Sequence, residues 1–113
     1  MATSSLFNEE LLKFCGEHTR DRLSMEILAF WGRHPEGRFM VGTVARAMDA
    51  KRLDVMRVIR LLSAEGIIDT FIQDDVVTYR LADNERIRRQ AMELAALNWY
   101  GRRAMCEHLG WKY

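Results

Sequence analysis

Residues 53–81, LDVMRVIRLLSAEGIIDTFIQDDVVTYRL, change their hydrophobic pattern at a single glycine, and this change decides the fold. Before Gly66, apolar residues recur at spacings of three and four, as on one side of an α-helix. After Gly66 the residues are rich in β-branched and aromatic types, which predicts two strands with Asp74 and Asp75 at the hairpin tip. We therefore expect a helix, a glycine stop in the left-handed conformation, and a hairpin that ends at Leu81.

Three further helices are predicted before this segment and one after it. Short polar residues that favour helix N-caps precede each of them: Ser5 or Asn8, Thr19, Thr43 and Asp83. Pro35 and Gly37 impose a turn after the second helix, and residues 38–41 read as a short extended stretch. The expected fold is mainly α with a small β-hairpin. It is a winged helix-turn-helix over residues 20–81, with an N-terminal helix over 6–18 and a C-terminal helix over 83–109.

Length and composition limit the class of protein. A chain of 113 residues is long enough for one domain, which we assign to residues 1–113. Hydrophobic residues make up 49% and charged residues 29%, which is typical of a globular protein. No segment approaches the roughly 20 apolar residues of a membrane helix, and the polar N-terminus does not resemble a signal peptide. We expect a cytoplasmic protein with reduced cysteines.

Positive charge gathers in the middle of the chain. The net charge is only +1, a weak indication for a nucleic-acid ligand. Residues 43–62, however, contain five basic and two acidic side chains, whereas residues 1–36 contain four basic and six acidic ones. The segment around the predicted helix of residues 53–65 is therefore the candidate surface for an anionic partner.

Three motifs within residues 22–81, about half of the chain, resemble the winged helix-turn-helix of bacterial and archaeal ArsR/SmtB-type repressors, and more loosely the MarR type. The motifs are VARAM (44–48), VMRVIRLLSAEGII (55–68) and VTYRL (77–81). The resemblance implies a dimer built by the terminal helices. It also implies that two recognition helices, here residues 53–65, read successive major grooves of a pseudo-palindromic operator.

The chain departs from this family in three places. The family often has serine and histidine beside the arginine of the recognition helix, where this chain has Met56 and Val58. The stretch RFMVGTVA (38–45) contains no cysteine, so arsenic-type Cys-x-Cys sensing is excluded. The wing tip has Asp74 and Asp75 in place of lysine or arginine, and carboxylates repel phosphates. We therefore expect little DNA contact from the tip.

The candidate DNA contacts lie on and near the recognition helix: Thr43, Lys51, Arg52, Asp54, Met56, Arg57 and Arg60. Arginine can bond guanine in the major groove, lysine neutralises phosphate, and methionine can touch a thymine methyl group. Arg57 is the best candidate for base reading. Two alternatives stay open: these charges form an ordinary solvated helix face, and Thr43 is a plain N-cap.

Apolar residues of the terminal helices suggest a homodimer interface. The candidates are Leu11, Leu12, Phe14, Cys15, Leu94, Leu97, Trp99 and Tyr100. The alternative is that both helices fold over the chain's own core, although a small helix-turn-helix offers limited surface for so many apolar side chains.

Cys15, His18, Cys106 and His108 are of the residue types that bind zinc or another soft metal ion. Cys106 and His108 are two residues apart, which places them on different faces of a helix. In the alternative interpretation, Cys15 is a small buried apolar residue and His18 and His108 lie on the surface. This is the more common situation for these residue types. We therefore expect neither metal nor cofactor, and leave an effector, small molecule or metal, unidentified.

The sequence lacks a phosphate-binding glycine loop, a nucleophile elbow and a histidine beside paired carboxylates, so we expect no enzyme. The predicted function is a dimeric DNA-binding transcriptional regulator, a repressor. The alternative is a winged-helix module that binds proteins and not specific DNA, which exposed Leu53, Met56 and Leu61 would suit. A scaffold subunit of an enzyme is a third class.

Overall fold

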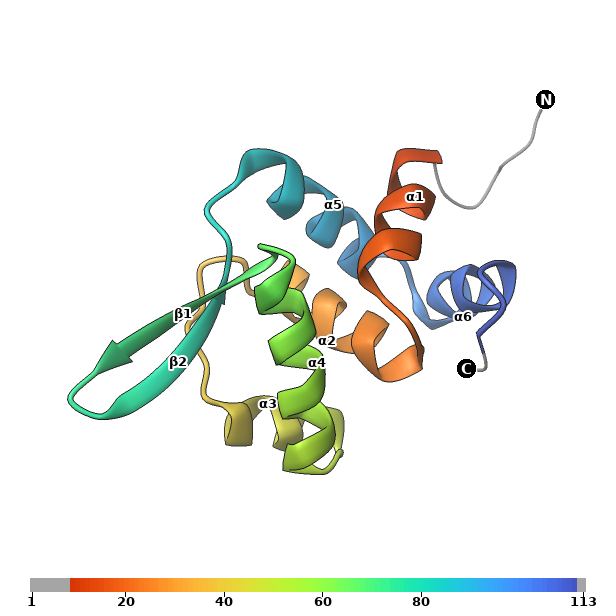
Figure 1. Ribbon diagram of the computed structural model, residues 1–113. Helices are drawn as coiled ribbons and strands as arrows, with labels where there is room; N and C mark the ends of the chain where they lie inside the picture. Colours follow the sequence, from red (N-terminus) through yellow and green to blue (C-terminus); the bar gives the residue numbers. More distant parts are fainter. Residues whose placement is uncertain (1–8, 112–113) are drawn as a thin grey trace.

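The structure, a computed structural model, describes residues 9–111 of the chain. These residues form six helices and one hairpin (Figure 1): α1 (Glu9–His18), α2 (Arg22–Arg33), α3 (Val41–Met48), α4 (Arg52–Ala64), β1 (Ile68–Gln73), β2 (Val76–Leu81), α5 (Glu85–Ala96) and α6 (Trp99–His108). The predicted fold class, mainly α with a small β-hairpin, is confirmed. The predicted recognition helix of residues 53–65 is α4, which begins and ends one residue earlier.

Helix α2 forms the centre of the core because apolar side chains cover most of its surface. Its buried apolar residues are Met25, Ile27, Leu28, Ala29, Phe30 and Trp31. A helix that is apolar nearly all round needs neighbours on every side. Helix α5 crosses α2 at Gly32, where a Cβ atom would lie 2.0 Å from the carbonyl oxygen of Ala91. The missing side chain at Gly32 therefore allows the two helices to approach closely.

The two strands pair antiparallel as a hairpin that projects from the helices (Figure 1). Ile68 and Leu81 face each other at the buried root of this wing. At the tip, Asp74 and Asp75 have positive φ angles of 52° and 65°. Two such residues in succession form the turn whose twist matches that of a two-residue hairpin. The predicted tip is confirmed.

The wing is joined to the helical body on both sides. Gly66 ends α4 with a φ of 79°, the left-handed conformation expected from the sequence. On the far side of β2, the backbones of Phe39 and Tyr79 exchange two hydrogen bonds of 2.9 Å. The extended stretch predicted over residues 38–41 thus contributes one bridge to the sheet.

The start of α2 differs from the prediction. Its N-cap is Asp21 instead of Thr19: the Asp21 carboxylate accepts a hydrogen bond from the Ser24 amide, and the Ser24 hydroxyl accepts one from the Asp21 amide. This reciprocal capping box satisfies two amides, which one threonine cannot do. Thr19 is buried, and its hydroxyl donates to the Cys15 carbonyl oxygen at 2.6 Å, which completes the end of α1.

The prediction of a single helix over residues 83–109 is wrong, because the chain becomes extended between α5 and α6. The Asn98 side chain accepts a hydrogen bond from the Gly101 amide and starts α6 as its N-cap. The first of the two helices is capped by Asn84 and not by Asp83. Asparagine suits both positions because its short side chain reaches the free amides of a first helical turn.

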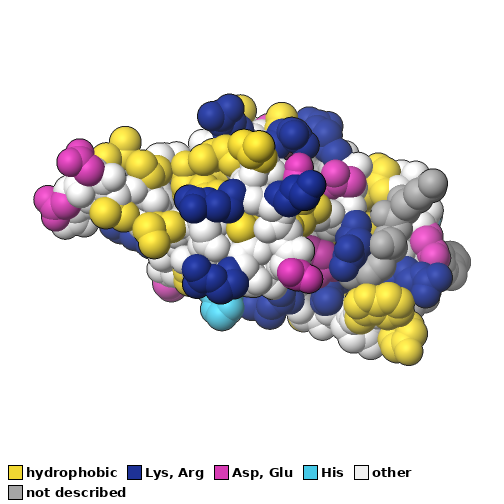
Figure 2. Space-filling view, turned by 90° about the horizontal axis from the view of Figure 1, so that it is seen from below, with side chains coloured by type: hydrophobic (Ala, Val, Ile, Leu, Met, Phe, Trp, Pro, Cys, Tyr) yellow, Lys and Arg dark blue, Asp and Glu magenta, His cyan; other side chains and the backbone are white. Residues whose placement is uncertain are grey.

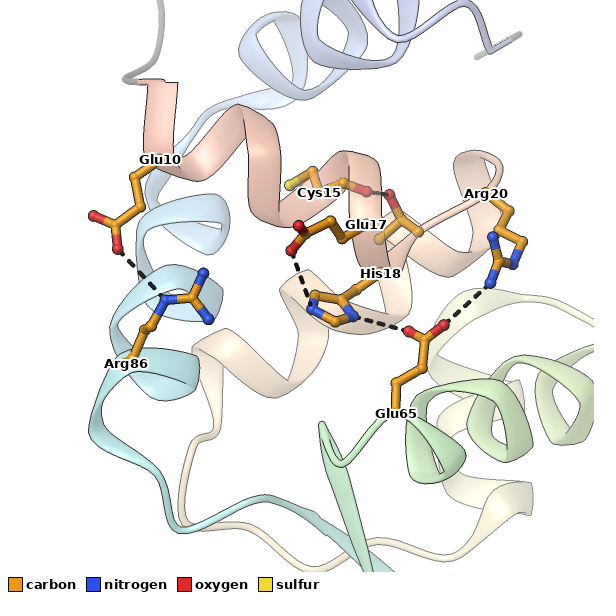
Figure 3. A network of polar contacts seen from close by, with 8 residues as sticks. Glu10, Cys15, Glu17, His18, Arg20, Glu65 and Arg86 are labelled. Atoms are coloured by element: carbon orange, nitrogen blue, oxygen red, sulfur yellow. Dashed lines mark hydrogen bonds and ion pairs between the residues drawn. The ribbon is translucent and has the colours of Figure 1, made fainter.

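The end of the predicted N-terminal helix, residue 18, is confirmed, while its start and the proposed caps Ser5 and Asn8 lie outside the described residues. Polar contacts connect this helix to the end of α4 (Figure 3). The Glu65 carboxylate bonds His18 Nδ1 at 2.8 Å and pairs with Arg20 at 3.1 Å. The orientation of α4 is therefore tied to α1 and to the α1–α2 junction.

Candidate nucleic-acid interface

Helices α3 and α4 form a helix-turn-helix whose turn is Asp49–Lys51. Asp49 adopts the left-handed conformation with φ at 52°, and its amide donates to carbonyl oxygens of the last turn of α3. This geometry ends α3 abruptly and starts α4 after three residues. Val44 of α3 and Ile59 of α4 are buried in the same core, so the opposite side of α4 faces outward.

Most candidate DNA contacts lie on this outward side. Lys51, Arg52, Arg57 and Arg60 are exposed, whereas Thr43, Asp54 and Met56 are half-buried. Leu53, also on this side, is 78% exposed. Figure 2 shows lysine and arginine side chains around an apolar patch on the face seen from below Figure 1. The surface is therefore both basic and apolar.

Apart from Arg22, the arginines fall into two groups according to the partners of their side chains. One group forms ion pairs with carboxylates: Arg20, Arg57, Arg86, Arg88, Arg89, Arg102 and Arg103. Within residues 9–111, the side chains of a second group have neither an ion pair nor a hydrogen bond: Arg33, Arg38, Arg46, Arg52, Arg60 and Arg80. All six lie between the end of α2 and the end of the wing. Positive charge without a local carboxylate partner is thus concentrated on the helix-turn-helix and wing.

Arg57 is the exception on α4, because it has a carboxylate partner. Its Nη1 lies 3.3 Å from Oδ1 of Asp54, one helical turn earlier. The side chains of Arg57 and Asp54 are 72% and 41% exposed, and surface pairs of this kind contribute about 0–1 kcal/mol. The pair orients the guanidinium without holding it strongly.

Thr43 is not an N-cap. Helix α3 begins at Val41 with Met40 as its cap residue, which places Thr43 inside the first turn. The Thr43 amide donates to the Met40 carbonyl oxygen at 3.1 Å and is therefore not free for a phosphate. The Arg52 guanidinium lies beside Gly42 in this same turn, so a side-chain cation stands where the sequence suggested a hydroxyl.

The base of the wing carries two cations that sequence reasoning missed. The guanidinium carbon of Arg38 lies 3.9 Å from the ring centre of Phe71, and that of Arg80 lies 4.9 Å from it. Such cation–π contacts hold the charged groups in place. No local sequence pattern indicates that Arg38 and Arg80 both lie against Phe71.

A groove runs along the exposed side of α4, and we call it the α4 groove. Its first part has a volume of about 510 Å³ and is lined by Leu53, Met56, Arg57, Arg60 and Leu61. Its second part, about 400 Å³, shares Met56 and Arg60 and continues to the wing root at Thr70 and Tyr79. The α4 groove therefore joins the recognition helix to the wing.

A second hollow, of about 370 Å³, lies between α4 and the α1–α2 junction. Arg57 of α4 and Arg20 and Asp21 of the junction are among its lining residues.

The structure does not bring the four candidate metal ligands together. Cys15 and Cys106 are buried in the core, His18 bonds Glu65, and His108 is exposed. No group of three or more histidine, cysteine, aspartate or glutamate side chains within residues 9–111 is arranged to hold a metal ion.

Both thiols are held in the neutral form. Burial, together with the neighbouring Cys106, raises the pKa of Cys15 to about 12. Burial, and next the Glu26 carboxylate, raises the pKa of Cys106 to about 11. Cys106 Sγ lies 3.5 Å from Met25 Sδ, so it packs as an apolar core group.

The candidate dimer residues fall into three classes by burial. Leu11, Phe14, Cys15 and Leu94 are buried within the chain's own core, Leu12 and Leu97 are half-buried, and Trp99 and Tyr100 are exposed. Only Trp99 and Tyr100, whose rings lie 5.1 Å apart at the start of α6, present large apolar surface to a partner.

Comparisons of the chain with protein-family models, curated proteins and solved structures find no match. None of the helices within residues 9–111 is long and apolar enough to cross a membrane.

Proposed function

We propose that this chain is a DNA-binding transcriptional regulator, a dimeric repressor that reads the major groove of duplex DNA with α4. The observation that supports this most is the division of the arginines. Those of α5 and α6 are paired with carboxylates, whereas Arg46, Arg52 and Arg60 on the helix-turn-helix have no such partner within the described residues. Unpaired cations on one face are what binding to phosphates requires.

The shape of this face supports the same proposal. Helix α4 presents its outward side beside a projecting wing, and a major groove accepts one α-helix. Lys51 and Arg52 stand at the N-terminus of α4, where a recognition helix approaches the bases and backbone. In this arrangement Arg57 reads a base, while Arg46, Arg52 and Arg60 hold phosphates.

Salt dependence of binding to a generic duplex tests the proposal. We expect the logarithm of the affinity to fall linearly and steeply with the logarithm of the salt concentration, as fluorescence anisotropy would measure. The variant Arg52→Ala with Arg60→Ala should bind more weakly and with a slope smaller by about two. The control, Arg86→Ala with Arg89→Ala, removes two arginines that pair with Glu10 on the far side of the molecule. Equal losses in both variants, or no binding at low salt, would refute the proposal.

A module that binds proteins is the second candidate, and the exposure of Leu53 and Leu61 favours it. Isolated apolar side chains of this size are commonplace, but these two line one groove. Binding of a partner protein that survives high salt, together with no affinity for duplex DNA, would support this candidate over the first.

The dimer within the proposal depends on Trp99 and Tyr100, because the other candidate interface residues are buried or half-buried. Tyr100 is 74% exposed and is the better residue to replace. Tyr100→Ser should shift the sedimentation equilibrium toward the monomer without lowering the thermal unfolding temperature of the monomer.

A further inference from the structure

The wing carries features that contact with DNA does not explain. Ile72 is 73% exposed, and Val76 and Val77 beside it on the hairpin are also exposed. Beyond them the tip ends in Asp74 and Asp75, whose carboxylates repel phosphates. Figure 2 shows acidic side chains at the far end of the wing, next to apolar ones. A projecting element with an acidic tip and apolar flanks suits an apolar site with a basic rim.

A site of that description lies on the same chain. The α4 groove has apolar walls at Leu53, Met56 and Leu61, and the cations of Arg57 and Arg60 stand at its edge. Its apolar side chains and the wing's apolar side chains are both left in solvent by the fold. The wing and the α4 groove therefore carry opposite charges, and both expose apolar side chains.

We propose that the wing of one copy docks in the α4 groove of a second copy, and that this contact covers the surface proposed to bind DNA. The second copy is the occupant because its charge matches: Asp74 and Asp75 of one chain meet Arg57 and Arg60 of the other. The self-contact stands on its own observations, and only its effect on DNA binding rests on the proposed function.

The place of the wing beside the groove makes the contact reciprocal. Thr70 and Tyr79 at the wing root line the same depression as Met56 and Arg60 of α4. Each strand of six residues spans about 17 Å, so the tip reaches well beyond its own body (Figure 1). With a two-fold axis between two copies, each wing enters the groove of the other, and the pair closes instead of growing into a filament.

Salt separates this contact from a dimer formed by α6. Ion pairs at an exposed rim weaken as salt screens them, whereas an apolar contact through Trp99 and Tyr100 does not depend on charge. Duplex DNA should also dissociate the wing contact, because both need Arg57 and Arg60. The protein would then pass from a self-blocked pair to a DNA-bound form as DNA is added.

The first experiment measures self-association by sedimentation equilibrium at low and high salt. We expect the component that high salt abolishes to be weakened roughly tenfold or more in Asp74→Asn with Asp75→Asn. Asparagine tolerates the positive φ angles of both positions, so the turn should persist. The control Glu9→Gln with Glu85→Gln removes two exposed carboxylates from the first turns of α1 and α5, and should associate as the unaltered chain does.

The second experiment exchanges the charges of the two surfaces. Asp74→Lys with Asp75→Lys, and separately Arg57→Asp with Arg60→Asp, should each lose the salt-sensitive association. An equal mixture of the two variants should regain it, since each wing then faces a groove of opposite charge. A variant that had lost association because it misfolds would not regain it on mixing. Recovery in the mixture would therefore show that the charges, and not a folding defect, caused the loss.

Several results would overturn the inference. The first is a salt-sensitive association that persists in Asp74→Asn with Asp75→Asn. The second is a salt-sensitive association that Tyr100→Ser abolishes and the asparagine variant does not. The third is an equal mixture of the two charge-exchanged variants that fails to associate. A chain that binds duplex DNA but stays monomeric at low salt would also overturn the inference, because the α4 groove would then bind DNA and no second copy. Conversely, a wing contact that DNA does not dissolve, in a protein without DNA affinity, would support the self-contact and refute the proposed regulator.

Discussion

Asp54 Oδ1 lies 3.3 Å from Arg57 Nη1 on the exposed side of α4, so the best candidate for base reading is also the one arginine of that helix with a carboxylate partner within the described residues. The pair costs little to break, because its members are exposed. It also has a directional effect: a guanidinium anchored by Asp54 is presented toward the N-terminal half of α4, where a recognition helix meets base edges.

Arg57→Ala should change which sequences the protein selects from random duplexes. If Arg57 bonds one guanine through O6 and N7, its loss relaxes selection at that position and costs about 1–3 kcal/mol of discrimination. Sequencing of the bound pool measures this. Arg103→Ala is the control, since Arg103 forms a similar exposed pair with Glu107 on α6. Selection that is unchanged by Arg57→Ala would remove Arg57 from the set of base-reading residues.

Gly32→Ala should destabilise the protein by about 2–4 kcal/mol, because its methyl group would overlap the Ala91 carbonyl and force α2 and α5 apart. Gly16→Ala provides the matched control. At Gly16 a Cβ meets only the Leu109 side chain at 3.5 Å, and the residue lies within α1. Alanine there should stabilise by up to about 1 kcal/mol. Urea unfolding of Gly32→Ala and Gly16→Ala measures both effects. Similar unfolding midpoints for the two variants would show that α2 and α5 can move apart at little cost.

The order of elements could be predicted because it depends on local patterns. Periodicity and Gly66 define α4 and the wing, and both lie where they were expected. The division between α5 and α6 was missed, since no proline interrupts residues 83–109 and Gly101 lies inside α6. Only Asn98 marks the start of α6, and an asparagine within an apolar pattern is ordinary.

The site was predicted less completely, for a physical reason. The charge of a face depends on which cations have partners, and those partners lie far away in sequence. Arg102 pairs with Glu26 and Arg88 with Glu36, so charge that the sequence counts as positive is neutralised on the far side of the fold. The same reasoning explains why Leu11 and Phe14 were assigned to a dimer interface: their burial by α5 and α6 depends on contacts that no local pattern contains.

The ion pair between Arg102 and Glu26 should contribute strongly to the docking of α6. It spans 2.8 Å, and its side chains are only 13% and 16% exposed. Arg102 also donates to the Leu97 carbonyl oxygen at 2.6 Å, next to the break before α6. Arg102→Leu leaves Glu26 without this guanidinium and should cost about 2–4 kcal/mol. The neighbouring Arg103→Ala should change stability by less than about 0.5 kcal/mol. Equal thermal shifts in the two variants would contradict this ranking.

The buried thiols should make the protein less stable at alkaline pH. Their pKa values are about 12 for Cys15 and about 11 for Cys106, above the ordinary 9.0, so the unfolded chain releases these protons at lower pH than the folded one. Below pH 9 both states hold the protons and neither thiol affects the pH dependence. Between pH 9 and 11 the unfolded state is favoured, and each thiol lowers the free energy of unfolding by up to about 1.4 kcal/mol per pH unit.

Denaturant unfolding at pH 8, 9 and 10 measures this decline, and Cys15→Ala should make it shallower although it lowers stability at every pH. The same burial predicts that a thiol reagent modifies the folded protein only as fast as the protein opens, because the thiolate is the reactive species and both sulfurs are covered. Modification that proceeds at the rate of a free thiol, without any loss of helix content, would mean that α1 and α6 separate from the core while the helix-turn-helix stays folded.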